Sequence, residues 1–400
     1  MIAPTPVSLC CALLLCLPLT IVFTITSPIV TTIVTITHYD SYKDPARNFV
    51  PISNNKKKFD IKHRSVVWPP PSLSPPPSPL QPPLPEDDES LFRLAARVNP
   101  KPQPLGTPKK LAFMFLTTTP LPFAPLWELF FNQTRTKKLF NIYIHADPSF
   151  HYDPPFSGTF AGRDIHSKPT QRFTPSLVSA ARRLLAHALL DDPSNAMFPL
   201  LSASCIPLHS FNFTYDTLIR SKKSFIEILS SEPGAYGRYI ARGEDAMFPE
   251  VPFEDFRIGS QFFVLTRRHA RLVVKDELLW SKFKLPCVQW DTCYPEENYL
   301  PTLLSMMDRR GCVPATLTHV DWTNQSDGHP RKYEASEVRP GLIVSLRGDR
   351  PRYGDDGGGF GNVTSSSLSK RHDPFLFARK FSPESLQPLM RIADDVIFHD

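Results

Sequence analysis

The amino-acid sequence predicts an α/β fold: a mostly parallel sheet flanked by helices, preceded by an N-terminal transmembrane helix and a proline-rich stem. Three observations lead to this prediction. Residues 7–37 contain no charged side chain, prolines crowd a segment further along, and strand-like and helix-like segments alternate from residue 109 onward. We therefore expect a signal-anchor region at 1–38, a proline-rich stem at 39–108 and a globular domain at 109–400.

The N-terminal segment is long enough to cross a bilayer, because about 20 apolar residues span the hydrocarbon core as a helix. A cleaved signal peptide is the alternative. The cations that follow the segment, including Lys43 and Arg47, would favour a cytoplasmic C-terminal side. Asn-x-Ser/Thr sequons favour the secretory lumen instead. These candidate N-glycosylation sites are Asn132, Asn212, Asn324 and Asn362.

The 400-residue chain contains 44 prolines, and they are densest in one segment. Ten of the seventeen residues from Pro69 to Pro85 are proline, and the acidic run Glu86–Glu89 follows them. Such a segment favours a polyproline II spacer. A ligand for an SH3-type domain is the alternative, but after a membrane segment we interpret the run as a lumenal stem whose acidic end is solvated.

Composition limits the classes of function. Hydrophobic residues make up 41% of the chain, which is enough to build a sizeable core. The 45 basic and 39 acidic side chains give a net charge of +6. This surplus suits anionic small ligands or a membrane surface and is too diffuse to predict nucleic-acid binding.

The globular region reads as an alternation of strands and helices. The predicted elements are strand Leu111–Thr117, a short helix at 126–131, strand Leu139–His145, helix Leu177–Leu190 and strand Met197–Leu201. Thr174 and Pro175 have the residue types of a helix N-cap and first turn. This order indicates a parallel sheet covered by helices, in which a ligand lies beyond the carboxyl ends of the strands.

Four of the seven cysteines lie in the globular region, at Cys205, Cys287, Cys293 and Cys312. Four cysteines allow three complete pairings. Cys287 could pair with Cys293 or with Cys312 to close a loop before a helix, and Cys205 could equally be a buried free thiol. No Cys-x-x-Cys pair occurs, so we expect no structural zinc.

Polar residues follow two predicted strands, as Thr117–Thr119 and as His145–Asp147. Turn formation explains them on its own, yet a nucleotide would bind at these strand ends. A second group is the pair Glu296 and Glu297 after Pro295. Acids in a first turn compensate the helix dipole, although a carboxylate at the mouth of such a site could also deprotonate a hydroxyl group.

A third group of candidates is basic and includes Arg331, Lys332, Arg339 and the pair Arg379–Lys380. Solvated charge is the default for each. The last pair lies between Phe377 and Phe381, so partial burial would require an anion, and a diphosphate is a natural one. No Asp-x-Asp pair occurs anywhere in the sequence, so side-chain cations would have to stabilise a leaving diphosphate.

These motifs resemble the plant branch of the core-2/I-branching β-1,6-N-acetylglucosaminyltransferases, the group that includes the brittle-culm glycosyltransferase-like proteins. The similarity covers about residues 109–400. The matching stretches are Ile144–Asp147, Ala181–Leu185, Ser204–Leu208, Phe256–Phe263, Tyr294–Leu304, His319–Thr323 and Leu376–Pro383.

The resemblance implies a single-pass type II Golgi membrane protein with a GT-A-like lumenal domain. Its activity would be inverting transfer from a UDP-sugar, N-acetylglucosamine or a related sugar, to a glycan or glycoprotein acceptor, with no cofactor and no metal. Matched position by position, Glu297 would be the catalytic base and Arg339 and Lys380 the diphosphate-binding cations. Thr117 and Asp147 would contact the nucleotide.

The sequence departs from the family pattern in two places. Asn298 and Leu300 replace a histidine and a Tyr-Phe pair after the two acids, and the segment 168–173 before the Arg182–Arg183 helix is unusual. Both departures lie near where the donor or acceptor sugar would bind, so they bear on the identity of the sugars rather than on the reaction type. They also leave a second hypothesis: a non-catalytic carbohydrate-binding protein of the Golgi or cell wall that retains the fold.

Overall fold

The structure is a computed structural model that describes residues 84–101, 106–133, 139–323, 329–357 and 371–400. The chain divides into two units, Met1–Ser78 and Pro79–Asp400, and every described residue belongs to the second. The expected signal-anchor region, most of the stem, and the sequons at Asn324 and Asn362 lie outside the described residues. Among the residues described, no helix is both long and apolar enough to span a membrane.

Within the described residues the main sheet has six strands in the order β2-β1-β3-β6-β5-β7. The strands are β1 (Lys110–Thr117), β2 (Phe140–Ala146), β3 (Asn195–Ser202), β5 (Ser224–Phe225), β6 (Val264–Thr266) and β7 (Cys312–Val313). Strand β1 pairs in parallel with β2 and β3, and β5 pairs in parallel with β7. Only β6 runs against its neighbours in this sheet. The mostly parallel sheet expected from the sequence is confirmed.

A second, three-stranded sheet has the order β4-β9-β8. It consists of β4 (Ile206–Pro207), β8 (Thr318–Val320) and β9 (Phe377–Arg379). Strand β9 comes from the far end of the chain, and in its parallel pairing with β8 Arg379 lies opposite Val320. The basic pair near the C-terminus is thereby brought beside a strand that lies about sixty positions earlier.

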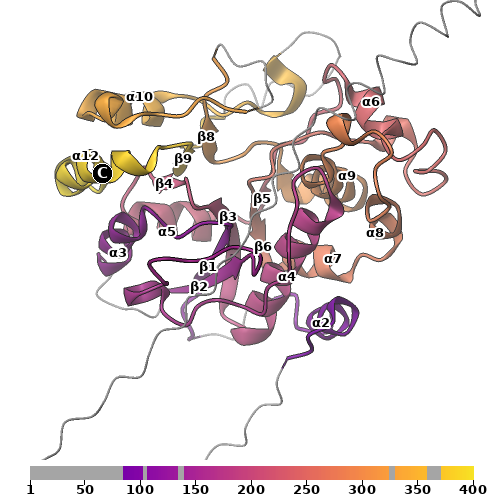
Figure 1. Cartoon of the computed structure of the whole chain (residues 1–400), viewed down its shortest axis with the longest axis horizontal. Helices are drawn as coiled ribbons and strands as arrows, with labels where there is room; N and C mark the ends of the chain where they lie inside the picture. The colour runs from indigo at the N-terminus through magenta and orange to yellow at the C-terminus, as the bar shows by residue number, and fades with distance from the viewer. Residues whose placement is uncertain (1–83, 102–105, 134–138, 324–328, 358–370) are drawn as a thin grey trace, which may run out of the picture. The chain divides into compact units, whose positions relative to one another are not determined.

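Helices cover both faces of the main sheet (Figure 1). The described α-helices are α2 (Asp88–Ala95), α3 (Ala124–Asn132), α4 (Pro175–Asp191), α5 (Phe211–Arg220), α6 (Ala235–Ile240), α7 (Arg267–Lys275), α8 (Leu278–Phe283), α9 (Pro295–Asp308), α10 (Pro340–Gly348) and α12 (Leu386–Arg391).

The alternation of side chains along β1 creates two cores. Leu111, Phe113 and Phe115 enter a core shared with α3, α5 and the small sheet. Ala112 and Met114 enter a second core shared with α2, α4, α7 and α9. Because both faces of the strand are buried, its sequence is continuously apolar, as expected for a central parallel strand.

The elements predicted between residues 111 and 201 are all present, with ends shifted by a few residues at most. Helix α4 begins where capping chemistry placed it. The Thr174 side chain accepts a hydrogen bond from the Ser176 backbone N–H, and Pro175 occupies the first turn. A side-chain oxygen at this position satisfies a backbone donor that has no partner inside the helix.

The N-terminal edge of the globular unit differs from the expected boundary at 109. Residues 88–95, placed by the sequence in the stem, form helix α2, which packs against α4 and α7. Its Leu91 and Ala95 are buried in the second core. The acidic run that we expected to be solvated therefore starts a helix of the folded unit, and the apolar residues just after it supply the reason.

Candidate active site

A cavity of about 1040 Å³ opens at the carboxyl edge of the main sheet. Its lining includes Thr118 just after β1, Glu227 just after β5, and Gly259–Phe262 just before the antiparallel strand β6. This is the edge at which ligands bind in open α/β sheets. A second cavity of about 490 Å³ lies beside β2, but the larger one contains Glu296, Glu297, Arg379 and Lys380 of the charged side chains singled out by the sequence.

Glu297 lies in the first turn of α9 and lines the large cavity. Its backbone carbonyl accepts a hydrogen bond from the Gly259 N–H at 2.8 Å, which ties the start of the helix to the neighbouring loop. Arg238 of α6 donates to Glu297 Oε2 at 2.7 Å. With 29% of its side chain exposed, the carboxylate is oriented by an ion pair and still accessible from the cavity.

Two aromatic rings support this ion pair. The guanidinium of Arg238 lies 4.3 Å from the centre of the Tyr294 ring, and Tyr294 makes an edge-to-face contact with Phe173 at 5.1 Å. A cation over an aromatic face is attracted by the ring quadrupole. Arg238 is therefore restrained by its aromatic contact as well as by its carboxylate partner.

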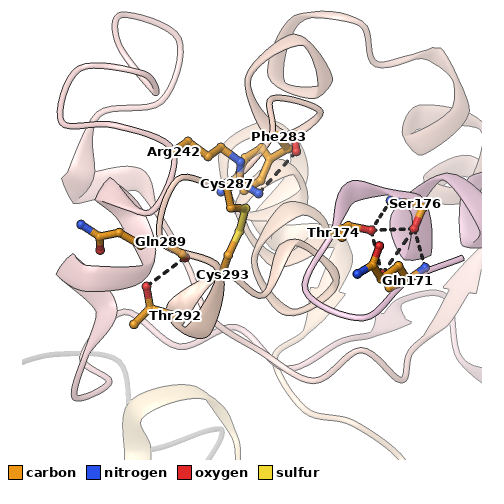
Figure 2. The surroundings of a disulfide bond; sticks show 9 residues. All are labelled: Gln171, Thr174, Ser176, Arg242, Phe283, Cys287, Gln289, Thr292 and Cys293. Carbon is orange, nitrogen blue, oxygen red and sulfur yellow. Dashed lines mark hydrogen bonds between the residues drawn. A yellow bond between two sulfur atoms is a disulfide. The ribbon is translucent and has the colours of Figure 1, made fainter. Parts of the chain in front are cut away.

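The segment before α9 is closed by a disulfide between Cys287 and Cys293 (Figure 2). This is one of the two pairings that the sequence left open for Cys287; Cys205 and Cys312 are buried free thiols. Beside the bridge, Arg242 lies over the Phe283 ring and Thr292 donates to the Gln289 carbonyl. The covalent link ends one residue before Tyr294 and so restrains the entry into α9.

Two further carboxyl groups lie beside Glu297. Burial raises the pKa of Glu296 to about 7 and, at the wall of the same cavity, that of Glu227 also to about 7. The negative charge of Glu297 adds to both shifts. Glu296 Oε2 is buried and has no hydrogen-bond partner among the described residues. The cavity thus contains one ion-paired carboxylate and two carboxyl groups that keep their protons to a higher pH than ordinary glutamates do.

Arg379 and Lys380 supply positive charge to the cavity lining. The Arg379 guanidinium lies 4.3 Å from the centre of the Phe262 ring, and burial lowers the pKa of Arg379. Its buried Nε has no hydrogen-bond partner in the described ranges. Partial burial of this pair agrees with the sequence argument that its cations need an anion.

Arg339 does not join this group. It is the exposed N-cap residue of α10 and does not line the cavity. Its local match to the family pattern depended on the short stretch Glu337–Arg339, in which Glu337 instead forms an ion pair with Arg331. The structure therefore unites Glu297 and Lys380 and leaves Arg339 outside the cavity wall.

Thr117 and Asp147 are both buried and do not line the cavity. Each instead contacts a residue at or next to the cavity lining. The Thr117 hydroxyl donates to the Thr119 carbonyl at 2.6 Å in the turn that presents Thr118. Asp147 Oδ2 accepts hydrogen bonds from the backbone N–H and the hydroxyl of Thr170, each at 2.6 Å. Burial opposes ionisation of Asp147, but hydrogen bonds from Thr170 and Ser149 outweigh it and hold its pKa below the ordinary value.

Sequence reasoning missed Arg238 and Glu227. Arg238 lies within the six-residue helix α6, and Glu227 lies two positions beyond the two-residue strand β5, so no periodicity or motif marked either. Among the residues described, no group of three or more His, Cys, Asp or Glu side chains converges in a way that could hold a metal ion.

The sheet and the cavity define an α/β protein with a pocket at the carboxyl edge of its sheet, lined by both acidic and basic side chains. Comparison with known proteins specifies the family. The model of the Core-2/I-Branching enzyme family matches residues 111–347. The chain is also 33% identical, over 319 residues, to the protein named Glycosyltransferase BC10 from Oryza sativa subsp. japonica, covering 72% of this chain and 77% of the rice protein.

The chain belongs to the Core-2/I-Branching enzyme family and is thus a member of a glycosyltransferase family. The resemblance inferred from the motifs is confirmed. The mainly parallel sheet flanked by helices also fits the GT-A-like fold that the resemblance implied.

Proposed function

We propose that this protein is an inverting, metal-independent glycosyltransferase that transfers a sugar from a UDP-sugar to a hydroxyl group of a glycan acceptor. The observation that carries the proposal is the joint presence of Glu297, Arg379 and Lys380 in the lining of one cavity. An ion-paired carboxylate and two neighbouring cations are what base-assisted displacement of a diphosphate requires. N-acetylglucosamine or a related sugar is the donor sugar we propose.

In the proposed reaction, Glu297 accepts the proton of the acceptor hydroxyl group while the oxygen of that hydroxyl group attacks the anomeric carbon of the donor sugar. The bond from that carbon to the diphosphate oxygen breaks on the opposite face, so the configuration inverts. Arg379 and Lys380 neutralise the negative charge that develops on the departing UDP. Lys380 keeps the role that the family motif gave it, and Arg379 takes the role first assigned to Arg339.

The structure weakens the case for a non-catalytic carbohydrate-binding protein. That hypothesis depended mainly on Asn298, which departs from the family pattern. Asn298 is fully buried and donates to the Arg257 carbonyl, and Leu300 is buried in the core. Neither side chain lines the cavity, so these replacements alter the packing of α9 rather than the chemistry of the site.

Release of UDP by the purified protein tests the reaction. We expect turnover of a UDP-sugar with a plant glycan acceptor in EDTA at a rate within about twofold of that in Mn²⁺, because side chains replace the metal charge. Strict dependence on Mn²⁺ would overturn the metal-independent mechanism. Tight glycan binding without turnover across a donor and acceptor library would favour the non-catalytic alternative.

We further propose that the protein is a single-pass type II protein of the Golgi membrane with its catalytic domain in the lumen. Asn132 and Asn212 are exposed, as acceptors of a glycan must be. Protease treatment of sealed microsomes is the test. We expect the C-terminus to be protected and Asn132→Gln and Asn212→Gln each to remove one glycan; a digested C-terminus would contradict lumenal placement.

A further inference from the structure

An ion-pair network links the first described helix to the wall of the cavity. Asp88, in the first turn of α2, accepts hydrogen bonds from Arg183 of α4 through Nε at 3.1 Å and through Nη2 at 2.5 and 2.6 Å. The same carboxylate accepts from Lys168 Nζ at 3.0 Å. Figure 1 shows α2 beside α4, against which it packs.

Lys168 begins the segment Lys168–Arg172, whose residues Thr170, Gln171 and Arg172 line the cavity. The segment contains no helix or strand, so side-chain contacts fix its path. The Lys168 backbone N–H donates to His145 Nε2 at 3.4 Å, and Thr170 is held by Asp147. Lys168 Nζ, bonded to Asp88, fixes the end of the segment that is nearest to α2.

The network places the Asp88 carboxylate against the buried guanidinium of Arg183. Only 3% of the Arg183 side chain is exposed, and a buried guanidinium needs a carboxylate partner. Burial alone would raise the pKa of Asp88, but hydrogen bonds from Arg183 and Lys168 outweigh it and keep the pKa below its ordinary value. Burial and the positive charge of Arg183 lower the pKa of His145 to about 4, so the imidazole is neutral and can accept through Nε2.

We propose that Asp88 is a positioning residue for the transfer reaction: α2 holds Lys168–Arg172 in the conformation that forms this part of the cavity wall. The helix that follows the proline-rich segment would then set donor affinity without touching the donor. This inference rests on the proposed function only in assigning the cavity to a UDP-sugar. The coupling of α2 to the cavity wall can be measured without any ligand.

The test compares four variants of the full-length chain. Lys168→Met removes the contact to the segment but leaves the Asp88–Arg183 pair intact, so folding is preserved. Asp88→Asn weakens both contacts, and Asp88→Glu restores the charge. Lys282→Met is the matched control, because Lys282 pairs with Glu250 at 2.9 Å and neither residue lines the cavity.

We expect Lys168→Met to raise KM for the UDP-sugar about threefold and Asp88→Asn about tenfold, with kcat within about twofold of the unmodified protein. Asp88→Glu should recover most of the KM change, and Lys282→Met should have no effect. Without ligand, the backbone amides of 168–172 should exchange hydrogen about tenfold faster in Lys168→Met.

Unchanged amide exchange and unchanged KM in Lys168→Met would overturn the proposal, even if Asp88→Asn failed to fold. A fall in kcat with constant KM would also overturn it, because a donor-positioning role changes KM. If the unmodified chain transferred no sugar at all, the proposed function would fail, while faster exchange confined to 168–172 would still support the coupling of α2 to the cavity wall.

Discussion

Glu296 and Glu297 are adjacent in sequence but differ in chemistry. Glu297 is ion-paired with Arg238 and partly exposed to the cavity, whereas Glu296 is buried and its Oε2 has no partner among the described residues. Acids in a first turn favour the helix dipole equally well at either position. The family resemblance predicts Glu297 as the base, and its exposure to the cavity is the difference from Glu296 on which that prediction depends.

The raised pKa of Glu296 predicts a pH-dependent stability. Because its folded-state pKa is about 7, against an ordinary value of 4.5, the folded state binds a proton more tightly than the unfolded chain between these pH values. The unfolding free energy should therefore fall as pH rises through this window. The side chain in Glu296→Gln cannot titrate. Between pH 5 and pH 8, the unfolding free energy of this variant should therefore increase by about 2 kcal/mol relative to that of the unmodified protein.

Urea denaturation of both proteins at the two pH values measures this difference, and the comparison cancels the titration of groups that do not interact with Glu296. If the unfolding free energies of the two proteins changed by the same amount between these pH values, Glu296 would ionise normally in the folded state.

Gly259 sits where three parts of the site meet. A Cβ atom there would lie 2.1 Å from the Glu227 carbonyl oxygen and 2.9 Å from Pro301 Cγ. We expect Gly259→Ala to destabilise the fold by about 1–3 kcal/mol and to reduce sugar transfer, because the backbone must move where Gly259 contacts α9. Thermal unfolding and UDP release measure the two effects.

Gly341→Ala is the matched control, since a Cβ at Gly341 meets no atom within 4 Å. Equal losses of stability and of sugar transfer in Gly259→Ala and Gly341→Ala would contradict the proposed close contact at Gly259.

At the scale of elements, the entry into α9 combines a disulfide, a stacked cation and a proline in the first turn. Removing the bridge in Cys287→Ala/Cys293→Ala should lower the unfolding free energy by about 2 kcal/mol, as expected for a short closed loop. Turnover should also fall, because Tyr294 follows Cys293 directly and supports Arg238.

Unfolding with and without a reducing agent measures the effect of the bridge. The unmodified protein should lose stability on reduction and the double variant should not. If the reducing agent lowered the unfolding free energy of both proteins equally, a group other than the Cys287–Cys293 disulfide would be responsible.

The sequence predicted the elements that local chemistry specifies. Strands β1, β2 and β3 are mostly apolar and largely buried, and α4 carries a threonine cap and a first-turn proline. Strands β5 and β7 have two residues each, too few to show any periodicity. Helix α2 was not foreseen because its acidic first turn adjoins a proline-rich run, and only its packing against α4 and α7 reveals its place in the domain.

At the scale of the whole molecule, the cavity wall is assembled from segments between residues 118 and 380. The position of the cavity at the carboxyl edge of the sheet could be predicted from the alternation of strands and helices. The membership of Arg238 and the exclusion of Arg339 could not, because each depends on contacts between segments far apart in sequence. Cations are common throughout this chain, so only the fold selects those that face the cavity.

The most direct test of the central claim compares Glu297→Gln with Glu254→Gln, an exposed acid outside the cavity lining, in EDTA. Sugar transfer and UDP binding are measured on the same preparations. We expect Glu297→Gln to reduce transfer at least 100-fold while UDP affinity stays within about twofold and Glu254→Gln remains fully active. Full transfer activity in Glu297→Gln would contradict the assignment of Glu297 as the catalytic base.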